Sequence, residues 1–140
     1  MLKTQLLQPQ ILSSLAAAGH GSKVLITDGN YPASTGSNPD AEHVYLNLAP
    51  GLVNATDVLK ALVSIIPIEA AEVMQTGDGS TPPIFAEFAA LLPVGMELQP
   101  VERFAFYEAA WEPDVCLVVA TGEARVYANL LLTIGVVAPA

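Results

Sequence analysis

Residues 16–32 read AAAGHGSKVLITDGNYP, and the interpretation of the whole chain starts from this stretch. Gly19 and Gly21 flank His20, which indicates a tight turn after a helix. A short apolar strand, Lys23–Thr27, follows the turn, and Asp28 stands where that strand ends. An imidazole titrates near neutral pH, so we expect His20 to lie in an active site with Asp28 brought back towards it.

Helices and strands are expected to alternate along the rest of the chain. Apolar residues at helical spacing, together with caps and prolines, predict helices over residues 9–18, 54–65, 82–91 and 100–111. Apolar or alternating runs predict strands over residues 23–27, 43–48, 70–75, 97–99, 115–120 and 129–134. This order predicts an α/β fold over residues 1–140, a single layered domain whose mixed or mostly parallel sheet is covered by helices. Residues 29–41, rich in Gly, Pro, Ser and Asn, predict a long functional loop directly after Asp28.

The composition argues against a nucleic-acid-binding protein and against a membrane-spanning segment. The 140 residues carry 5 Lys and Arg against 14 Asp and Glu, a net charge of −9, which argues against nucleic-acid binding. Hydrophobic residues make up 52%, yet no apolar run is long enough to span a bilayer, so we expect the surplus apolar surface to form subunit contacts in a homo-oligomer. A single cysteine, Cys116, and an N-terminal segment without the layout of a signal peptide predict a cytoplasmic protein without an intramolecular disulfide.

Several kinds of catalytic site are disfavoured by the motifs. Two histidines and one cysteine, without HxH, CxxC or HExxH spacing, predict no metal site. No Gly-rich phosphate loop is present, and Ser13 and Ser14 lie on a helix face without a nucleophile elbow. The remaining polar candidates are one His, one Asp, one Arg, one Tyr and one Asn, a set suited to binding hydroxyl groups and moving protons: His20, Asp28, Arg103, Tyr127 and Asn129.

Each candidate also has a plain structural interpretation. His20 could cap a carbonyl at a helix end, and Asp28 could cap the turn after its strand. Arg103 could pair with Glu102 or Glu108 on the surface. Tyr127 and Asn129 could simply flank a strand. Asn129 stands beside an apolar run, however, where a buried amide needs partners for both its donors and its acceptor.

Five segments resemble the RbsD/FucU family of sugar mutarotases: LAAAGHG at 15–21, TDGNYP at 27–32, RFAFYE at 103–108, TGE at 121–123 and YAN at 127–129. The resemblance implies a compact α/β fold in ring-like homo-oligomers, often decamers. It also implies an isomerase that needs no cofactor and interconverts anomers or ring forms of L-fucose or D-ribose.

The resemblance also assigns roles residue by residue. His20 matches the catalytic acid/base, and the sugar-binding positions are Asp28, Arg103, Tyr127 and Asn129, with Ala128 contributing its backbone. Tyr127 could also serve as the second proton carrier. Arg103 resembles the fucose branch, since the ribose branch has a histidine there. Gly29, Asn30 and the 33–42 loop depart from the fucose pattern, which affects substrate identity more than reaction type.

Three functions stay open at this point. The first is an L-fucose mutarotase acting through His20, and the second is a D-ribose pyranase. The third is a regulatory oligomer that binds a monosaccharide without turning it over. Asp28 has two open roles as well, orienting His20 or binding a sugar hydroxyl.

Overall fold

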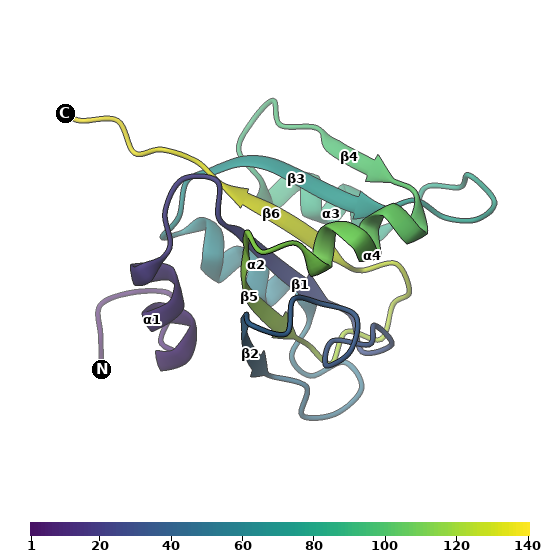
Figure 1. The fold of residues 1–140 in the computed structure, drawn as a ribbon, viewed down its shortest axis with the longest axis horizontal. Helices are drawn as coiled ribbons and strands as arrows, with labels where there is room; N and C mark the ends of the chain where they lie inside the picture. The colour runs from purple at the N-terminus through teal and green to yellow at the C-terminus, as the bar shows by residue number, and fades with distance from the viewer.

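The computed structural model covers residues 1–140 and contains ten regular elements (Figure 1). They are, in chain order, α1 (Pro9–Ala17), β1 (Lys23–Thr27), β2 (Glu42–Tyr45), α2 (Ala55–Val63), β3 (Ile68–Met74), α3 (Ile84–Leu91), β4 (Leu98–Val101), α4 (Arg103–Trp111), β5 (Val115–Ala120) and β6 (Leu130–Ile134).

The strands form one mixed sheet in the order β2-β5-β1-β6-β3-β4. The β1–β5, β2–β5 and β3–β4 pairs are parallel, whereas β6 runs antiparallel to both of its neighbours, β1 and β3. The start of β6 therefore lies beside the end of β1, which brings residues after Thr27 close to residues before Leu130. This arrangement confirms the predicted α/β class and the mixed sheet.

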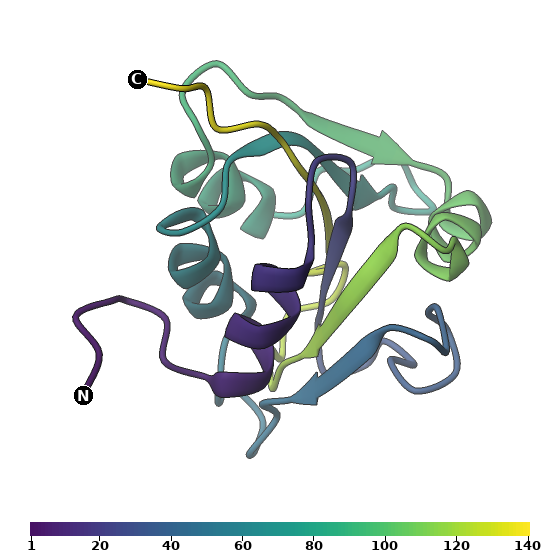
Figure 2. The same ribbon diagram turned by 60° about the vertical axis from the view of Figure 1, so that its left-hand side comes forward.

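Helices cover the two faces of the sheet unequally (Figure 2). Helices α1, α2 and α3 pack on one face, where the core includes Val24 and Ile26 of β1. Helix α4 and part of the 29–41 loop cover the other face, which Leu25 shares with Phe106. Because successive strand residues point to opposite faces, the apolar run of β1 is buried on both sides.

Every predicted helix and strand has a counterpart, and the boundaries differ most at the end of β2, which stops at Tyr45 rather than at residue 48, and at the start of α4. Pro100 and Val101 belong to β4 rather than to the helix that we predicted from residue 100. A proline is tolerated there because β4 is an edge strand. The helix begins at Arg103 because the Glu102 carboxylate caps it, accepting from the Phe104 and Ala105 N–H groups at 3.0 and 3.1 Å.

None of the helices is long and apolar enough to cross a membrane.

Candidate active site

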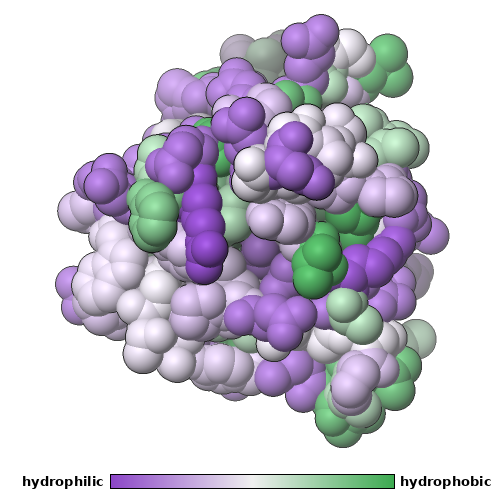
Figure 3. Space-filling view, turned by 90° about the vertical axis from the view of Figure 1, so that its right-hand side faces the viewer, coloured by the Kyte–Doolittle hydropathy of each residue, from purple (hydrophilic) through white to green (hydrophobic).

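Four of the predicted sugar-binding side chains line one cavity of about 280 Å³: Asp28, Arg103, Tyr127 and Asn129. The cavity lies where β1 ends and β6 begins, next to the first turn of α4. Asn30, Tyr31, Met74, Tyr107 and Val126 complete its wall. Figure 3 shows this end of the molecule, where hydrophilic groups dominate the surface and separate hydrophobic groups interrupt them.

Asp28 connects several segments of the cavity wall by hydrogen bonds. Its side chain is buried, and Oδ1 accepts from the Asn30 and Tyr31 N–H groups, both at 2.9 Å. Oδ2 accepts from the Ala128 N–H and from Asn129 Nδ2, both at 3.2 Å, while the Asp28 N–H donates to Asn129 Oδ1 at 2.8 Å. Burial raises the pKa of Asp28, and the hydrogen bonds from these N–H groups oppose that shift. Asp28 thus joins the end of β1 to the start of β6.

Tyr127 has an unusual backbone conformation. Its φ of 59° lies in the left-handed region, which costs a non-glycine residue about 1–3 kcal/mol. The residue immediately precedes Ala128, whose N–H binds Asp28, so the strained turn and the Asp28 network are continuous. Tyr127 lines the cavity and is half-buried.

Arg103 is the first residue of α4 and its side chain is exposed. Its guanidinium carbon lies 5.8 Å from the Phe104 ring centroid and 5.9 Å from the Tyr107 ring centroid, so two aromatic rings hold the group by cation–π contact. None of the chain's ion pairs involves Arg103. The predicted alternative, a surface pair with Glu102 or Glu108, is therefore absent, and Arg103 lines the cavity with no carboxylate partner.

His20 lies away from this cavity in the same chain. The Gly21 N–H donates to the Ile134 carbonyl at 2.9 Å, which ties the His20 turn to the end of β6, whereas Asp28 is tied to Asn129 at its start. The four residue steps of β1 alone span about 13 Å. The expectation that Asp28 is brought back towards His20 is wrong within one chain, because the two residues flank opposite ends of a strand.

The partner of His20 is a carboxylate that the sequence interpretation missed. His20 Nε2 lies 2.8 Å from Glu69 Oε2, and the two side chains are 58% and 45% exposed. Glu69 sits near the start of β3, 49 positions further along the chain, where no local pattern signals a contact with His20. The sequence interpretation also missed Met74 and Val126, which line the cavity.

The segment leading to Tyr127 is held by a buried acid. Glu123 is 2% exposed, and its carboxylate accepts from Arg125 Nε at 2.8 Å and from Arg125 Nη2 at 3.0 Å. Hydrogen bonding to this guanidinium lowers the pKa of Glu123 against the opposing effect of burial. Arg125 also pairs with Glu87 of α3, and the Ala55 N–H at the start of α2 donates to Glu123 at 3.3 Å.

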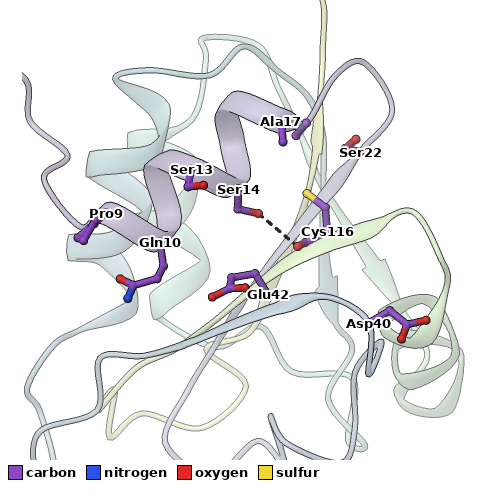
Figure 4. A pocket seen from close by; sticks show the side chains of 10 residues that line it. Pro9, Gln10, Ser13, Ser14, Ala17, Ser22, Asp40, Glu42 and Cys116 are labelled. Atoms are coloured by element: carbon purple, nitrogen blue, oxygen red, sulfur yellow. Dashed lines mark hydrogen bonds between the residues drawn. The ribbon is translucent and has the colours of Figure 1, made fainter.

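A separate cavity of about 600 Å³ lies between α1 and strands β2 and β5 (Figure 4). The Ser14 hydroxyl donates to the Cys116 carbonyl at 3.3 Å, and burial raises the pKa of the Cys116 thiol. Ser13 and Ser14 both line this cavity, but no histidine does. It therefore offers no activated nucleophile, and none of the predicted site residues reaches it. No group of three or more His, Cys, Asp or Glu side chains is placed to hold a metal ion.

Comparison with known proteins identifies the family. A model of the RbsD / FucU transport protein family matches residues 1–137. The chain belongs to this family.

Relatives match the chain over almost its whole length. A fucose mutarotase of Danio rerio is 35% identical, covering 95% of this chain and 91% of the relative. A D-ribose pyranase of Paracidovorax citrulli is 32% identical over 97% and 98% of the two chains. Among solved structures, FucU from Bifidobacterium longum has a TM-score of 0.81 at 33% identity, covering 94% of this chain and 95% of the other. Bacillus subtilis RbsD complexed with D-ribose has a TM-score of 0.81 at 25% identity, covering 99% and 100%.

These RbsD/FucU relatives confirm the family resemblance and the predicted fold class. They also confirm the predicted class of enzyme, an isomerase of the sugar mutarotase and pyranase type.

Proposed function

We propose that this RbsD/FucU chain is a cofactor-independent mutarotase that interconverts the anomers of free L-fucose. The observation that carries the proposal is one cavity in which a free guanidinium, a phenol and a buried amide converge: Arg103, Tyr127 and Asn129. The curated relatives named fucose mutarotase support the same reaction.

The cavity suits a ligand rich in hydroxyl groups. Arg103 offers donors only, whereas Asn129 offers both a donor and an acceptor. The reciprocal pair with Asp28 uses one hydrogen of Asn129 Nδ2 and one lone pair of Oδ1, which leaves one of each for a sugar. The Tyr127 hydroxyl can donate or accept. Ala128 is buried behind the cavity wall, and its N–H binds Asp28. Asp28 contributes mainly by holding Asn129 and Ala128 in place.

Apolar side chains in the wall favour a 6-deoxy sugar. Met74 and Val126 line the cavity beside Tyr127 and provide a surface for the methyl group of L-fucose. D-ribose has no such methyl group, which makes D-ribose pyranase activity the second candidate. Arg103 stands where the ribose branch has a histidine, which also favours L-fucose.

Ring opening removes a proton from the anomeric hydroxyl and adds one to the ring oxygen, and closure on the other face inverts the anomer. Both transfers are proton transfers to and from oxygen, which an imidazole can carry out as general acid or base. We assign one transfer to His20, oriented by Glu69, and the other to Tyr127. Because His20 lies at the other end of β1 in its own chain, we propose that it serves the cavity of a second copy in a homo-oligomer, for which the family resemblance implies a decamer. A cytoplasmic location belongs to the same proposal, since Cys116 stays reduced there.

Magnetisation-transfer NMR on free sugars tests the reaction directly. Purified protein should speed anomer exchange of L-fucose more than that of D-ribose, and His20→Ala should lose about 10²-fold or more in rate. Sugar binding without accelerated exchange would instead favour the non-catalytic regulatory oligomer. If the protein accelerates anomer exchange of neither L-fucose nor D-ribose nor any other aldose tested, the enzymatic proposal is overturned.

Mixing two inactive variants tests whether each site uses two copies. His20→Ala and Tyr127→Phe are expected to be weakly active alone. When equal amounts are unfolded and refolded together, about one quarter of the sites should combine an intact His20 with an intact Tyr127 if the two come from different chains. Activity that stays at the level of the separate variants contradicts the shared site, and light scattering gives the subunit number.

A further inference from the structure

The segment 121–128 includes a strained backbone conformation that must be held by its contacts. It must keep Tyr127 in the left-handed region and aim the Ala128 N–H at Asp28. Residues 124–127 belong to no helix or strand, so the sheet does not hold them. Val126 is 61% exposed, which leaves little packing to fix this part of the chain.

Arg125 supplies the missing restraint from within the segment. Its guanidinium binds both carboxylate oxygens of Glu123, at 2.8 and 3.0 Å, and its own N–H donates to Glu123 Oε1 at 3.1 Å. The bidentate pairing fixes the orientation of the guanidinium plane. The remaining arm pairs with Glu87 on α3.

The two carboxylates connect the segment to the helical layer. Glu123 accepts from the Ala55 N–H at the first residue of α2, and Glu87 belongs to α3. Helices α2 and α3 pack against each other on the sheet face opposite α4. Arg125 thus anchors the segment that carries Tyr127 to two helices that do not themselves line the sugar cavity.

On the basis of the proposed function, we propose that Arg125 is a positioning residue for the sugar site. Through Glu123 and Glu87 it holds residues 124–128 in the conformation that places Tyr127 in the cavity wall and keeps the Ala128 N–H on Asp28. Without the guanidinium, the buried Glu123 carboxylate loses its charge partner and the strained Tyr127 turn loses its anchor. The fraction of molecules with a competent site then falls, and the apparent sugar affinity falls by the same factor.

Arg125→Gln tests the proposal, with Lys60→Gln as the control. Lys60 is exposed on α2, and its replacement changes the net charge by the same amount. Relative to the control, we expect hydrogen exchange at the Ala128 amide to become about tenfold faster or more and the KM for the sugar to rise about tenfold. Glu87→Gln should shift both quantities in the same direction by less, because that pair is partly exposed.

Hydrogen exchange at the Ala128 amide and the KM for the sugar together distinguish a failure of this proposal from a failure of the proposed reaction. If the wild-type protein exchanges no sugar anomers, the mutarotase assignment fails, while Ala128 amide exchange still decides the role of Arg125. Arg125→Gln could lower the melting temperature while its KM and its Ala128 exchange rate stay equal to those of the control. That result means that the ion pair is merely structural, and it overturns the proposal. If Arg125→Gln does not fold, Glu87→Gln provides the test, because this variant leaves the Arg125–Glu123 pair intact. Hydrogen exchange at the Ala128 amide of Glu87→Gln at the rate of the control also overturns the proposal.

Discussion

Replacing Gly122 by alanine is expected to destabilise the fold strongly, because there is no room for a side chain at this position. A Cβ there would lie 2.6 Å from the carbonyl carbon of Leu52, with the carbonyl oxygens of Leu52 and Ala49 closer still. Carbon atoms pack comfortably at about 3.5–4.0 Å, so the overlap is about 1 Å. The neighbours are backbone atoms and cannot rotate away as a side chain would.

Relieving the overlap requires the two backbone segments to move apart. Two hydrogen bonds join them, from the Gly122 N–H to the Val53 carbonyl at 2.9 Å and from the Gly51 N–H to the Gly122 carbonyl at 2.6 Å. Losing both costs about 1–3 kcal/mol at about 0.5–1.5 kcal/mol each. Overpacking strain adds about 1–3 kcal/mol. We therefore expect Gly122→Ala to lower the free energy of unfolding by about 2–6 kcal/mol, a large share of the stability of a domain of this size.

Guanidinium denaturation, followed by tryptophan fluorescence and circular dichroism, measures this loss as a shift in midpoint at constant slope. Gly77→Ala is the matched control, since a Cβ at Gly77 would meet no heavy atom within 4 Å. The reasoning is refuted if the two alanine variants unfold within about 0.5 kcal/mol of each other, the usual range for unconstrained surface changes.

Four further predictions test other parts of the molecule. Thr27→Val should be neutral or stabilise the chain by about 1 kcal/mol in thermal unfolding, because the buried Thr27 hydroxyl has no hydrogen-bond partner. Tyr31→Phe should cost about 1–2 kcal/mol in denaturant titrations, because the buried Gly36 carbonyl loses its 2.7 Å bond from the Tyr31 hydroxyl. The lowered pKa of Glu123 stabilises the folded state above the unfolded-state pKa of about 4.3, and this contribution disappears as the pH falls through the folded-state value. The stability difference between wild type and Glu123→Gln, measured from pH 7 to pH 3, should therefore shrink on the acid side; a constant difference contradicts it. Arg103→Lys should raise the sugar KM about tenfold with an unchanged melting temperature, since it keeps the charge but loses the planar fork.

Local patterns were sufficient for much of the fold. The runs Lys23–Thr27 and Val115–Ala120 coincide with β1 and β5, because strands buried on both faces leave uninterrupted apolar stretches. The boundary between β4 and α4 could not be predicted from the sequence, because Pro100 is acceptable both as a helix start and in an edge strand. Only the sheet order distinguishes the two.

Some contacts of the site likewise depend on the arrangement of the strands and not on the local sequence. Asp28 follows the end of β1 and Asn129 precedes the start of β6, so the two meet only because β6 runs antiparallel to β1. The family resemblance grouped them in one site, whereas the local pattern did not fix the direction of β6. The His20–Glu69 contact could not be predicted, because it depends on which strands are neighbours rather than on spacing along the chain. The direction of β1 alone already separates His20 from Asp28, and the sequence interpretation overlooked that constraint.

The position of β6 has a consequence for biosynthesis. Within the sheet, β6 is the only link between the β2-β5-β1 half and the β3-β4 half, and it is the last of the six strands to be translated. Before residues 130–134 are translated, the chain lacks the strand that joins the two halves of the sheet, and the edges of β1 and β3 that pair with β6 have no partner. The native sheet order, and with it the cavity that Asn129 lines, therefore forms only after β6 has been translated.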